Sequence, residues 1–247
     1  MVNAVLRKVA RDGFALPSDE TPEGAALAHS HPRWIVDLWW DWLGPDETRA
    51  LLAANNRPAE RATREMHGQT LHQSTASQRV ATIVDPQPGE RVLDLCAAPG
   101  NKTSHLSDLM GQDGEVVAYE RHEGRAAALG ARMRSLGATA VTVVHADARA
   151  AAGAFDRVLL DPPCSGLGTL ARNPDLRWRM TPERIAGLLE EQAALLEVAR
   201  ACVRPGGRLV YSVCTLNPAE EQLEGEPVRT WPHRDGTDGF SIVARDG

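Results

Sequence analysis

The stretch RVLDLCAAPGNKTSHLSDLM, residues 91–110, decides which fold the chain is expected to adopt. Its first part, RVLDLC, is an apolar run of strand length, and its last part, SHLSDLM, repeats apolar residues at helical spacing. Between them lies CAAPGNKTS, a loop of small residues that turns at Pro99-Gly100. A strand that leads through a compact turn into a helix is the repeating unit of a doubly wound α/β sheet.

The same alternation of strand and helix continues to the end of the chain. We expect further strands at residues 115–120, 140–145, 155–161, 208–213 and 239–245, and helices at 121–137 and 182–203. Near-continuous apolar strands joined by helices predict a parallel sheet with helices on both faces. The predicted fold class is therefore α/β, a doubly wound Rossmann-like sheet, in which ligands bind at the carboxyl ends of the strands.

The N-terminal part has a different pattern. Residues 1–56 alternate apolar stripes with polar faces, which predicts a small all-helical segment with one helix starting at Pro45. The tryptophans at positions 34, 39, 40 and 42 favour core packing over a base-stacking platform. Residues 57–79 are polar and lack a clear period, so we expect a linker or crossing loop there and an α/β domain at 80–247.

The composition limits the class of protein. With 247 residues, 43% of them hydrophobic, the chain can bury a sizeable core. No run approaches the roughly 18 apolar residues of a membrane span, and the N-terminus lacks the apolar core of a signal peptide, so we expect a cytoplasmic protein. The formal net charge of -6 argues mildly against a broad nucleic-acid surface, but it leaves room for a local basic patch.

The cysteines indicate thiols rather than disulfides or a metal site. Cys96, Cys164, Cys202 and Cys214 lack the dense spacing of a disulfide scaffold and the spacing of a zinc site. We therefore predict no metal, and free thiols that are either buried or catalytic. Cys202 falls on the apolar face of the helix at 182–203 and is expected in the core.

Polar or reactive side chains follow the ends of successive predicted strands. In chain order these are Glu120, Asp147, Asp161 with Cys164, and Cys214. An acidic residue after the second strand can accept hydrogen bonds from ribose hydroxyls, and Asp147 would lie near an adenine. The loop after the first strand is neither GxGxxG nor a P-loop, so it favours a nucleoside with an amino-acid tail over a phosphate.

Three motifs, DLCAAPGNKTSHLSDLM, LLDPPCSGLGTLARNPDLRWR and LVYSVCTLNPAEEQ, resemble the signature motifs of the Sun/Fmu family. These proteins are RNA cytosine-5 methyltransferases that use S-adenosyl-L-methionine. The resemblance is specific over residues 85–222. The N-terminal region resembles the end of the NusB-like domain of the 16S rRNA members, and PHRDGTDGF resembles the family's last hairpin.

The resemblance implies a methyltransferase whose partner is RNA, specifically ribosomal RNA, and which we expect to act as a monomer. The loop at 96–102 would hold the methionine part of the cofactor, Glu120 the ribose and Asp147 the adenine side. The implied cofactor-binding residues are Cys96, Ala97, Ala98, Pro99, Gly100, Asn101, Lys102, Glu120, Asp147 and Asp161. The implied catalytic residues are Cys214 as the nucleophile, Cys164 for product release, and Asp161 near both cofactor and base.

Methylation of cytosine at carbon 5 would use both thiols, Cys214 and Cys164. Carbon 5 of cytosine accepts a methyl group from a sulfonium only after a thiolate has added to carbon 6. The thiolate is the active form, so its surroundings must lower its pKa. Asp161, if protonated, could donate to ring nitrogen N3 as negative charge develops there. Arg172, Arg177 and Arg179 are expected to contact RNA phosphates.

Other interpretations stay open at this point. The cysteine pair could be structural or disulfide-bonded, and the enzyme could methylate a small molecule or a protein. The chain could also be an RNA-binding or ribosome-assembly protein that keeps the fold but has little activity. Two departures bear on this alternative: Asn101 stands where the family usually has glycine, and the segments at 57–79 and before RTWPHRDG look abbreviated.

Overall fold

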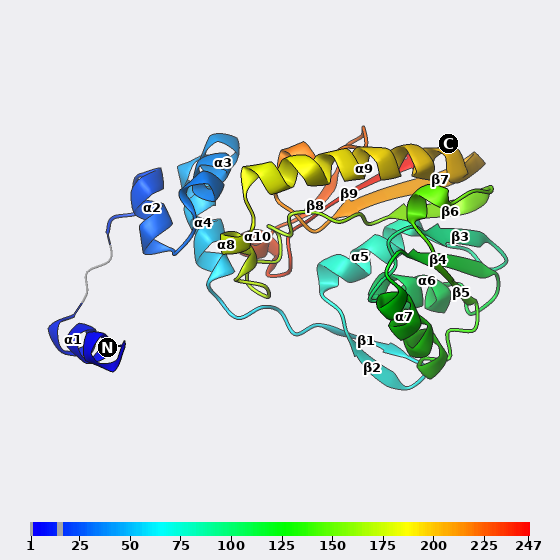
Figure 1. The fold of residues 1–247 in the computed structure, drawn as a ribbon, viewed down its shortest axis with the longest axis horizontal. Helices are drawn as coiled ribbons and strands as arrows, with labels where there is room; N and C mark the ends of the chain where they lie inside the picture. Colours follow the sequence, from blue (N-terminus) through cyan, green and yellow to red (C-terminus); the bar gives the residue numbers. More distant parts are fainter. Residues whose placement is uncertain (1, 14–16) are drawn as a thin grey trace.

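The computed structural model describes residues 2–13 and 17–247, with a helical N-terminal part beside a layered α/β part (Figure 1). The strands of the main sheet are β3 (Arg91–Asp94), β4 (Glu115–Glu120), β5 (Val141–His145), β6 (Phe155–Leu160), β7 (Val203–Val213), β8 (Val228–Thr230) and β9 (Phe240–Asp246). They lie in the order β5-β4-β3-β6-β7-β9-β8. The first five of these are parallel, which confirms the predicted α/β sheet. The last strand, β9, is antiparallel to β7 because it returns through a hairpin from β8.

Helices cover both faces of the sheet, as predicted. Helices α5 (Thr75–Val84), α6 (Asn101–Leu109) and α7 (Glu123–Ser135) lie on one face, and α9 (Pro182–Cys202) covers the other (Figure 1). Successive side chains on β6 enter opposite layers, because a strand alternates its side chains across the sheet. Val158 packs in the core beneath α9, and Leu159 packs in the core beneath α5 and α6.

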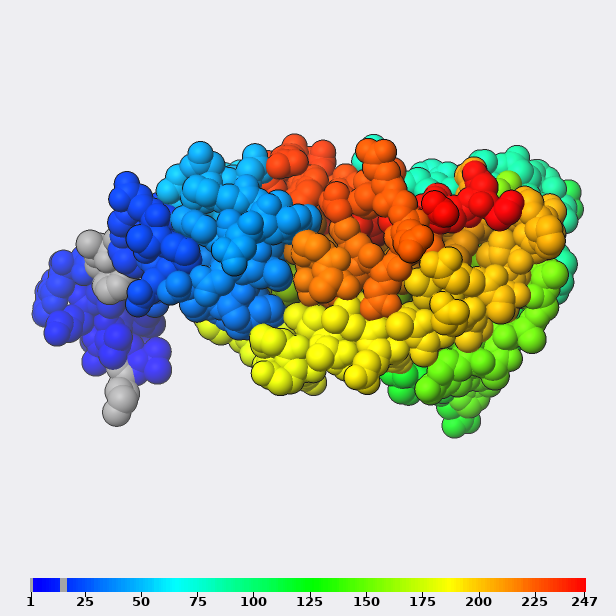
Figure 2. Space-filling view, turned by 90° about the horizontal axis from the view of Figure 1, so that it is seen from above, coloured from blue at the N-terminus to red at the C-terminus, as the bar shows by residue number. Residues whose placement is uncertain are grey.

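The helices of the N-terminal part are α1 (Val2–Asp12), α2 (Pro22–Ala28), α3 (Arg33–Leu43) and α4 (Pro45–Asn55), so the predicted helix start at Pro45 is confirmed. Helices α2, α3 and α4 share an apolar cluster with loops of the α/β part, whereas α1 buries none of its residues. The surface of α3 and α4 runs directly into that of the C-terminal segment (Figure 2). Trp39 is fully buried, and the other three tryptophans join the same apolar cluster, as expected for core packing. The indole Nε1 of Trp39 donates to the carbonyl oxygen of Leu216 at 2.8 Å.

Residues 57–79 contain secondary structure that their polar composition conceals. Strands β1 (Thr63–Met66) and β2 (Gln69–His72) form an antiparallel hairpin, and α5 begins before the segment ends. Both turn residues, His67 and Gly68, have positive φ (48° and 77°), which suits a two-residue hairpin turn. The side chain of Arg64, on β1, is buried, and its Nε donates to Gln73 Oε1 at 2.7 Å.

Short helices lie in the loops around the carboxyl ends of the strands. They are η1 (Ala148–Ala150), α8 (Leu176–Arg179), η2 (Pro218–Glu220) and α10 (Pro232–Asp235). In the ranges that the structure describes, every helix is too short or too polar to span a bilayer.

Candidate active site

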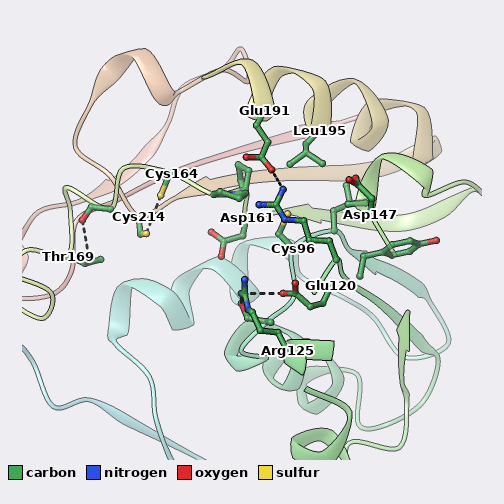
Figure 3. A pocket seen from close by; sticks show the side chains of 18 of the residues that line it. Cys96, Glu120, Arg125, Asp147, Asp161, Cys164, Thr169, Glu191, Leu195 and Cys214 are labelled. Carbon is green, nitrogen blue, oxygen red and sulfur yellow. Dashed lines mark hydrogen bonds and ion pairs between the residues drawn. The ribbon is translucent and has the colours of Figure 1, made fainter. Parts of the chain in front are cut away.

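A cavity of about 400 Å³ opens at the carboxyl ends of β3, β4, β6 and β7 (Figure 3). This volume is within the range of small-molecule sites. In Figure 3, Cys164 and Cys214 lie at one end, Glu120 and Asp147 lie toward the other, and Asp161 lies between them. The predicted site residues that line the cavity are Cys96, Ala98, Glu120, Asp147, Asp161, Cys164 and Cys214. The other predicted residues of this loop, Ala97, Pro99, Gly100, Asn101 and Lys102, are not among the lining residues.

Two thiols meet at one end of the cavity, which we call the cysteine end. Cys164 and Cys214 follow the neighbouring parallel strands β6 and β7, and their Sγ atoms are 3.3 Å apart. Both are free thiols. The hydrogen bond to Cys214, together with burial, raises the pKa of Cys164 well above its ordinary value. Cys164 therefore stays protonated near neutral pH and can donate its S–H to the sulfur of Cys214.

A buried ion pair lies beside the thiols. Lys102 Nζ donates to Asp161 Oδ2 at 2.6 Å, and Ser212 Oγ donates to Asp161 Oδ1 at 2.9 Å. Burial lowers the pKa of Lys102, but the Asp161 carboxylate outweighs it and leaves that pKa raised. The raised pKa keeps Lys102 protonated, so an ammonium group lies beside the Asp161 carboxyl oxygens.

The loop after β3 is shaped by glycine and held by α7. Gly100 has a φ of 96°, and a Cβ atom there would lie 2.5 Å from Leu129 Cδ1. Asn101 is the first residue of α6 and is not among the residues with positive φ, so its backbone does not require a glycine. Arg132 donates to Asn101 Oδ1 at 2.6 Å and to the Pro99 carbonyl at 2.9 Å. The Asn101 side chain thus helps to fix the loop.

Beneath this loop lies a carboxyl group that the sequence analysis did not single out. Asp94 ends β3 and is 1% exposed. Its Oδ2 accepts a hydrogen bond from Thr103 at 2.8 Å, while Oδ1 has no partner among the residues that the structure describes. Burial raises the pKa of Asp94 to about 6. Burial also raises the pKa of Cys96, which keeps this thiol protonated.

Two carboxylates mark the other end of the cavity, which we call the cofactor end after the roles expected for Glu120 and Asp147 from the sequence. Glu120 is buried, accepts from the His122 backbone N–H at 2.8 Å and lies 3.2 Å from Arg125. Asp147 accepts three hydrogen bonds from the backbone and side chain of Arg149. The side-chain bonds from Arg149 lower the pKa of Asp147 to about 2.

The arginines after Cys164 do not share one role. Arg177 is 4% exposed and donates to the Ser30 carbonyl at 3.1 Å and to Asn56 Oδ1 at 2.9 Å, so the prediction that it contacts phosphate is wrong. It joins α8 to the N-terminal helices instead. Arg179 pairs with Asp175 on the surface, and Arg172 is half-exposed, so their phosphate contacts stay predictions.

The sequence analysis also missed Glu220, a fully buried acid behind the two cysteines. It belongs to the third motif, but acidic residues are common in loops, and nothing in the sequence marks this one as buried. Across residues 2–13 and 17–247, the His, Cys, Asp and Glu side chains form no group of three that could hold a metal ion.

Comparison with known sequences places the chain in a family. The family described as 16S rRNA methyltransferase RsmB/F matches residues 81–224. A relative from Synechocystis, "Probable ribosomal RNA small subunit methyltransferase B", is 48% identical over 159 residues, which cover 62% of this chain and 36% of the relative. Ribosomal RNA small subunit methyltransferase B of Vibrio cholerae is 30% identical over an alignment of 274 residues, covering 91% of this chain and 62% of the relative. The chain thus spans less than two thirds of either relative.

Solved structures agree with the sequence comparison. The crystal structure of PH0851 is 26% identical with a TM-score of 0.82, covering 94% of this chain and 69% of that one. NSun6 from Pyrococcus horikoshii, solved with SFG, is 29% identical with a TM-score of 0.64, covering 71% and 52%. The matched family, the methyltransferase sheet and the motifs at its strand ends agree, and the chain belongs to the 16S rRNA methyltransferase RsmB/F family.

Proposed function

We propose that this chain transfers a methyl group from S-adenosyl-L-methionine to carbon 5 of a cytosine in RNA, specifically ribosomal RNA, through a covalent bond between Cys214 and carbon 6. The observation that carries the proposal is the 3.3 Å approach of two free thiols in a cavity whose other end presents a buried carboxylate, Glu120. Transfer to an oxygen or nitrogen atom needs no such pair of thiols.

The cavity fits S-adenosyl-L-methionine in size and in polar groups. Glu120 lines it with its carboxylate and can accept hydrogen bonds from ribose hydroxyls. The loop before α6 presents backbone N–H groups at a helix N-terminus, which suits the carboxylate of a methionine tail. The cofactor supplies an electrophilic methyl group, and the similarity to NSun6 solved with SFG supports this assignment.

Each side chain at the cysteine end has a task in this reaction. The Cys214 sulfur adds to carbon 6, which makes carbon 5 nucleophilic. Asp161 lines the cavity, and the Lys102 ammonium paired with it can offset part of the negative charge that develops on the ring. When the bond between the Cys214 sulfur and carbon 6 breaks, a base takes the proton from carbon 5, the two ring electrons restore the double bond, and the S–H of Cys164 can stabilise the Cys214 thiolate that leaves.

The direct test uses labelled S-adenosyl-L-methionine and ribosomal RNA with the wild-type chain, Cys214→Ala and Cys164→Ala. We expect 5-methylcytosine from the wild type, neither product nor adduct from Cys214→Ala, and a covalent RNA complex that accumulates with Cys164→Ala. Methylation by Cys214→Ala at the wild-type rate, or a methyl group found on oxygen or nitrogen, would rule out the covalent mechanism.

The surface beside the cavity suits an RNA strand. Asn173 and Leu176 line the cavity at α8, and next to them Trp178 is 63% exposed on a helix that also carries Arg179. Arg179→Glu should weaken RNA binding and flatten its salt dependence. Arg200→Glu, near the far end of α9, is the matched control and should bind RNA as the wild type does.

A second candidate is an RNA-binding or ribosome-assembly protein with little activity. It is favoured by the 274-residue alignment with the Vibrio cholerae protein, which is longer than the 247 residues of this chain, so that relative carries segments that this chain lacks. Specific RNA binding without a methylated product, under conditions in which the cofactor binds, would favour this candidate.

A further inference from the structure

A buried polar cluster lies directly behind the two cysteines. Its centre is the carboxylate of Glu220, and we call it the Glu220 cluster: Ser165, Gln192, Thr215, Asn217 and Glu220. All five residues are at most 5% exposed, and Ser165, Gln192 and Glu220 are completely buried. None of them was predicted as a functional residue from the sequence.

The carboxylate accepts hydrogen bonds on both of its oxygens. Oε1 accepts from the Ser165 backbone N–H at 2.8 Å and from Gln192 Nε2 at 3.1 Å. Oε2 lies 2.5 Å from Ser165 Oγ, 3.1 Å from Thr215 Oγ1 and 3.3 Å from Asn217 Nδ2. The partners are neutral groups that can all donate, and an ionised carboxylate is the side chain that only accepts. The cluster therefore selects a carboxylate at position 220.

The partners of Glu220 adjoin the cysteines in the chain. Ser165 directly follows Cys164, and Thr215 directly follows Cys214. Their hydroxyl oxygens are also 2.7 Å apart, so the two loops meet at the carboxylate as well as at the sulfurs. Gln192 of α9 also connects Glu220 to the Cys164 loop, because its Nε2 donates to the Pro163 carbonyl at 2.9 Å as well as to Glu220.

We propose that Glu220 is a positioning residue that sets the distance between the Cys164 and Cys214 sulfurs by binding the residue after each of them. The proposal rests on the proposed function only for its catalytic consequence. The sulfur geometry itself can be measured without any methyl transfer. A displacement of about 1 Å between reacting groups can lower a rate about a hundredfold, so this distance matters for catalysis.

The test compares Glu220→Gln with Glu221→Gln. The glutamine at 220 has nearly the same shape, but it turns an NH₂ group toward groups that donate. Glu221 is the matched control, because it is the next residue, carries the same charge and pairs with Arg229 rather than with the cysteine loops.

The first measurement is the rate of disulfide formation between Cys164 and Cys214 with diamide, which takes up the two electrons and two protons that the thiols lose. Glu220→Gln should form the disulfide about tenfold more slowly than the wild type, and Glu221→Gln at the wild-type rate. The second is the methylation assay, in which Glu220→Gln should lower kcat about a hundredfold and leave KM for S-adenosyl-L-methionine unchanged.

The outcomes separate the two proposals. If the wild type does not methylate RNA, the proposed function fails, but the diamide rates still decide whether Glu220 positions the sulfurs. Wild-type disulfide formation and kcat in Glu220→Gln would overturn the positioning role. If Glu220→Gln does not fold, Thr215→Val decides, because it removes one hydroxyl at nearly constant shape and should slow both rates severalfold. Unchanged rates in a folded Thr215→Val would also overturn the role.

Discussion

The two ends of the cavity hold their carboxylates in different ways. At the cofactor end, Glu120 and Asp147 pair with arginines that are 57% and 63% exposed. At the cysteine end, Glu220 is completely buried among neutral donors, and Asp161 pairs with a largely buried lysine. Exposed ion pairs contribute little and exchange readily for other partners, whereas a buried network fixes one geometry. The cofactor end can therefore adjust to a ligand, and the cysteine end is built in advance.

The largest effect is expected from breaking the ion pair at the cysteine end. Asp161→Asn leaves the Lys102 ammonium buried without its counter-charge and removes the carboxylate that lines the cavity beside the cysteines. We expect kcat for RNA methylation to fall about 10²–10³-fold, a larger loss than that of cofactor affinity. Steady-state kinetics with RNA, together with calorimetric binding of S-adenosyl-L-methionine, would measure both quantities.

A second variant separates chemistry from stability in this pair. Lys102→Met with Asp161→Asn removes both charges and should recover the melting temperature that Asp161→Asn alone loses. The double variant should remain as inactive as the single one. Recovery of activity in the double variant would show that the ion pair is only structural.

The next effect concerns Asp94, which lies beneath the loop that joins the two ends. Its pKa of about 6 exceeds the ordinary value of 3.8, so the folded chain keeps a proton that the unfolded chain loses as the pH rises from about 4 to about 6. The folded state therefore loses the stability that the bound proton gives it as the pH rises from about 4 to about 6. Asp94→Asn should therefore be about 3 kcal/mol more stable than the wild type at pH 8 and nearly equal at pH 4.

Melting curves at several pH values test this prediction. Asp113→Asn, an exposed site with the same loss of charge, is the control and should follow the wild-type profile. An Asp94→Asn profile parallel to that of the wild type would mean that the buried carboxyl does not carry the pH dependence.

At the cofactor end, Glu120→Gln should weaken binding without slowing the chemistry. The amide oxygen can still accept from the His122 N–H, but the amide NH₂ would face Arg125 or the ribose hydroxyls that Glu120 is proposed to bind. We expect the Kd for S-adenosyl-L-methionine to rise about tenfold, with kcat unchanged at saturation. Glu115→Gln, at the opposite end of the same strand, should bind the cofactor normally.

The smallest effect is expected at Asp147. Its carboxylate is already engaged by Arg149 and is 39% exposed, so Asp147→Asn should change cofactor affinity by less than about threefold. Calorimetric titration would show it. If Asp147→Asn lost more cofactor affinity than Glu120→Gln, Asp147 would be the more important carboxylate for binding. The contrast between an adjustable cofactor end and a fixed cysteine end would then be wrong.

Local pattern sufficed for the α/β fold but not for every part of the site. Strand β4 and helix α9 lie where the apolar periodicity predicts them, because in long, regular segments the spacing of apolar residues shows which face is buried. The hairpin in residues 57–79 was missed, since its buried Arg64 reads as polar and its turn lacks the usual Asn-Gly. Arg177 and Glu220 were misjudged or missed for one reason: burial of a charged group depends on partners far away in the chain, here at Ser30 and Ser165.

The bond from the Trp39 indole to the Leu216 carbonyl has a practical consequence for dissecting this chain. Leu216 is two residues past Cys214, and with Leu167 and Leu170 it is covered by side chains of α3 and α4. A fragment that starts after residue 56 would expose these leucines to water and leave the carbonyl to solvent. Helices α3 and α4 thus complete the apolar core beneath the loops that carry the two cysteines, and a fragment without them would lack part of that core.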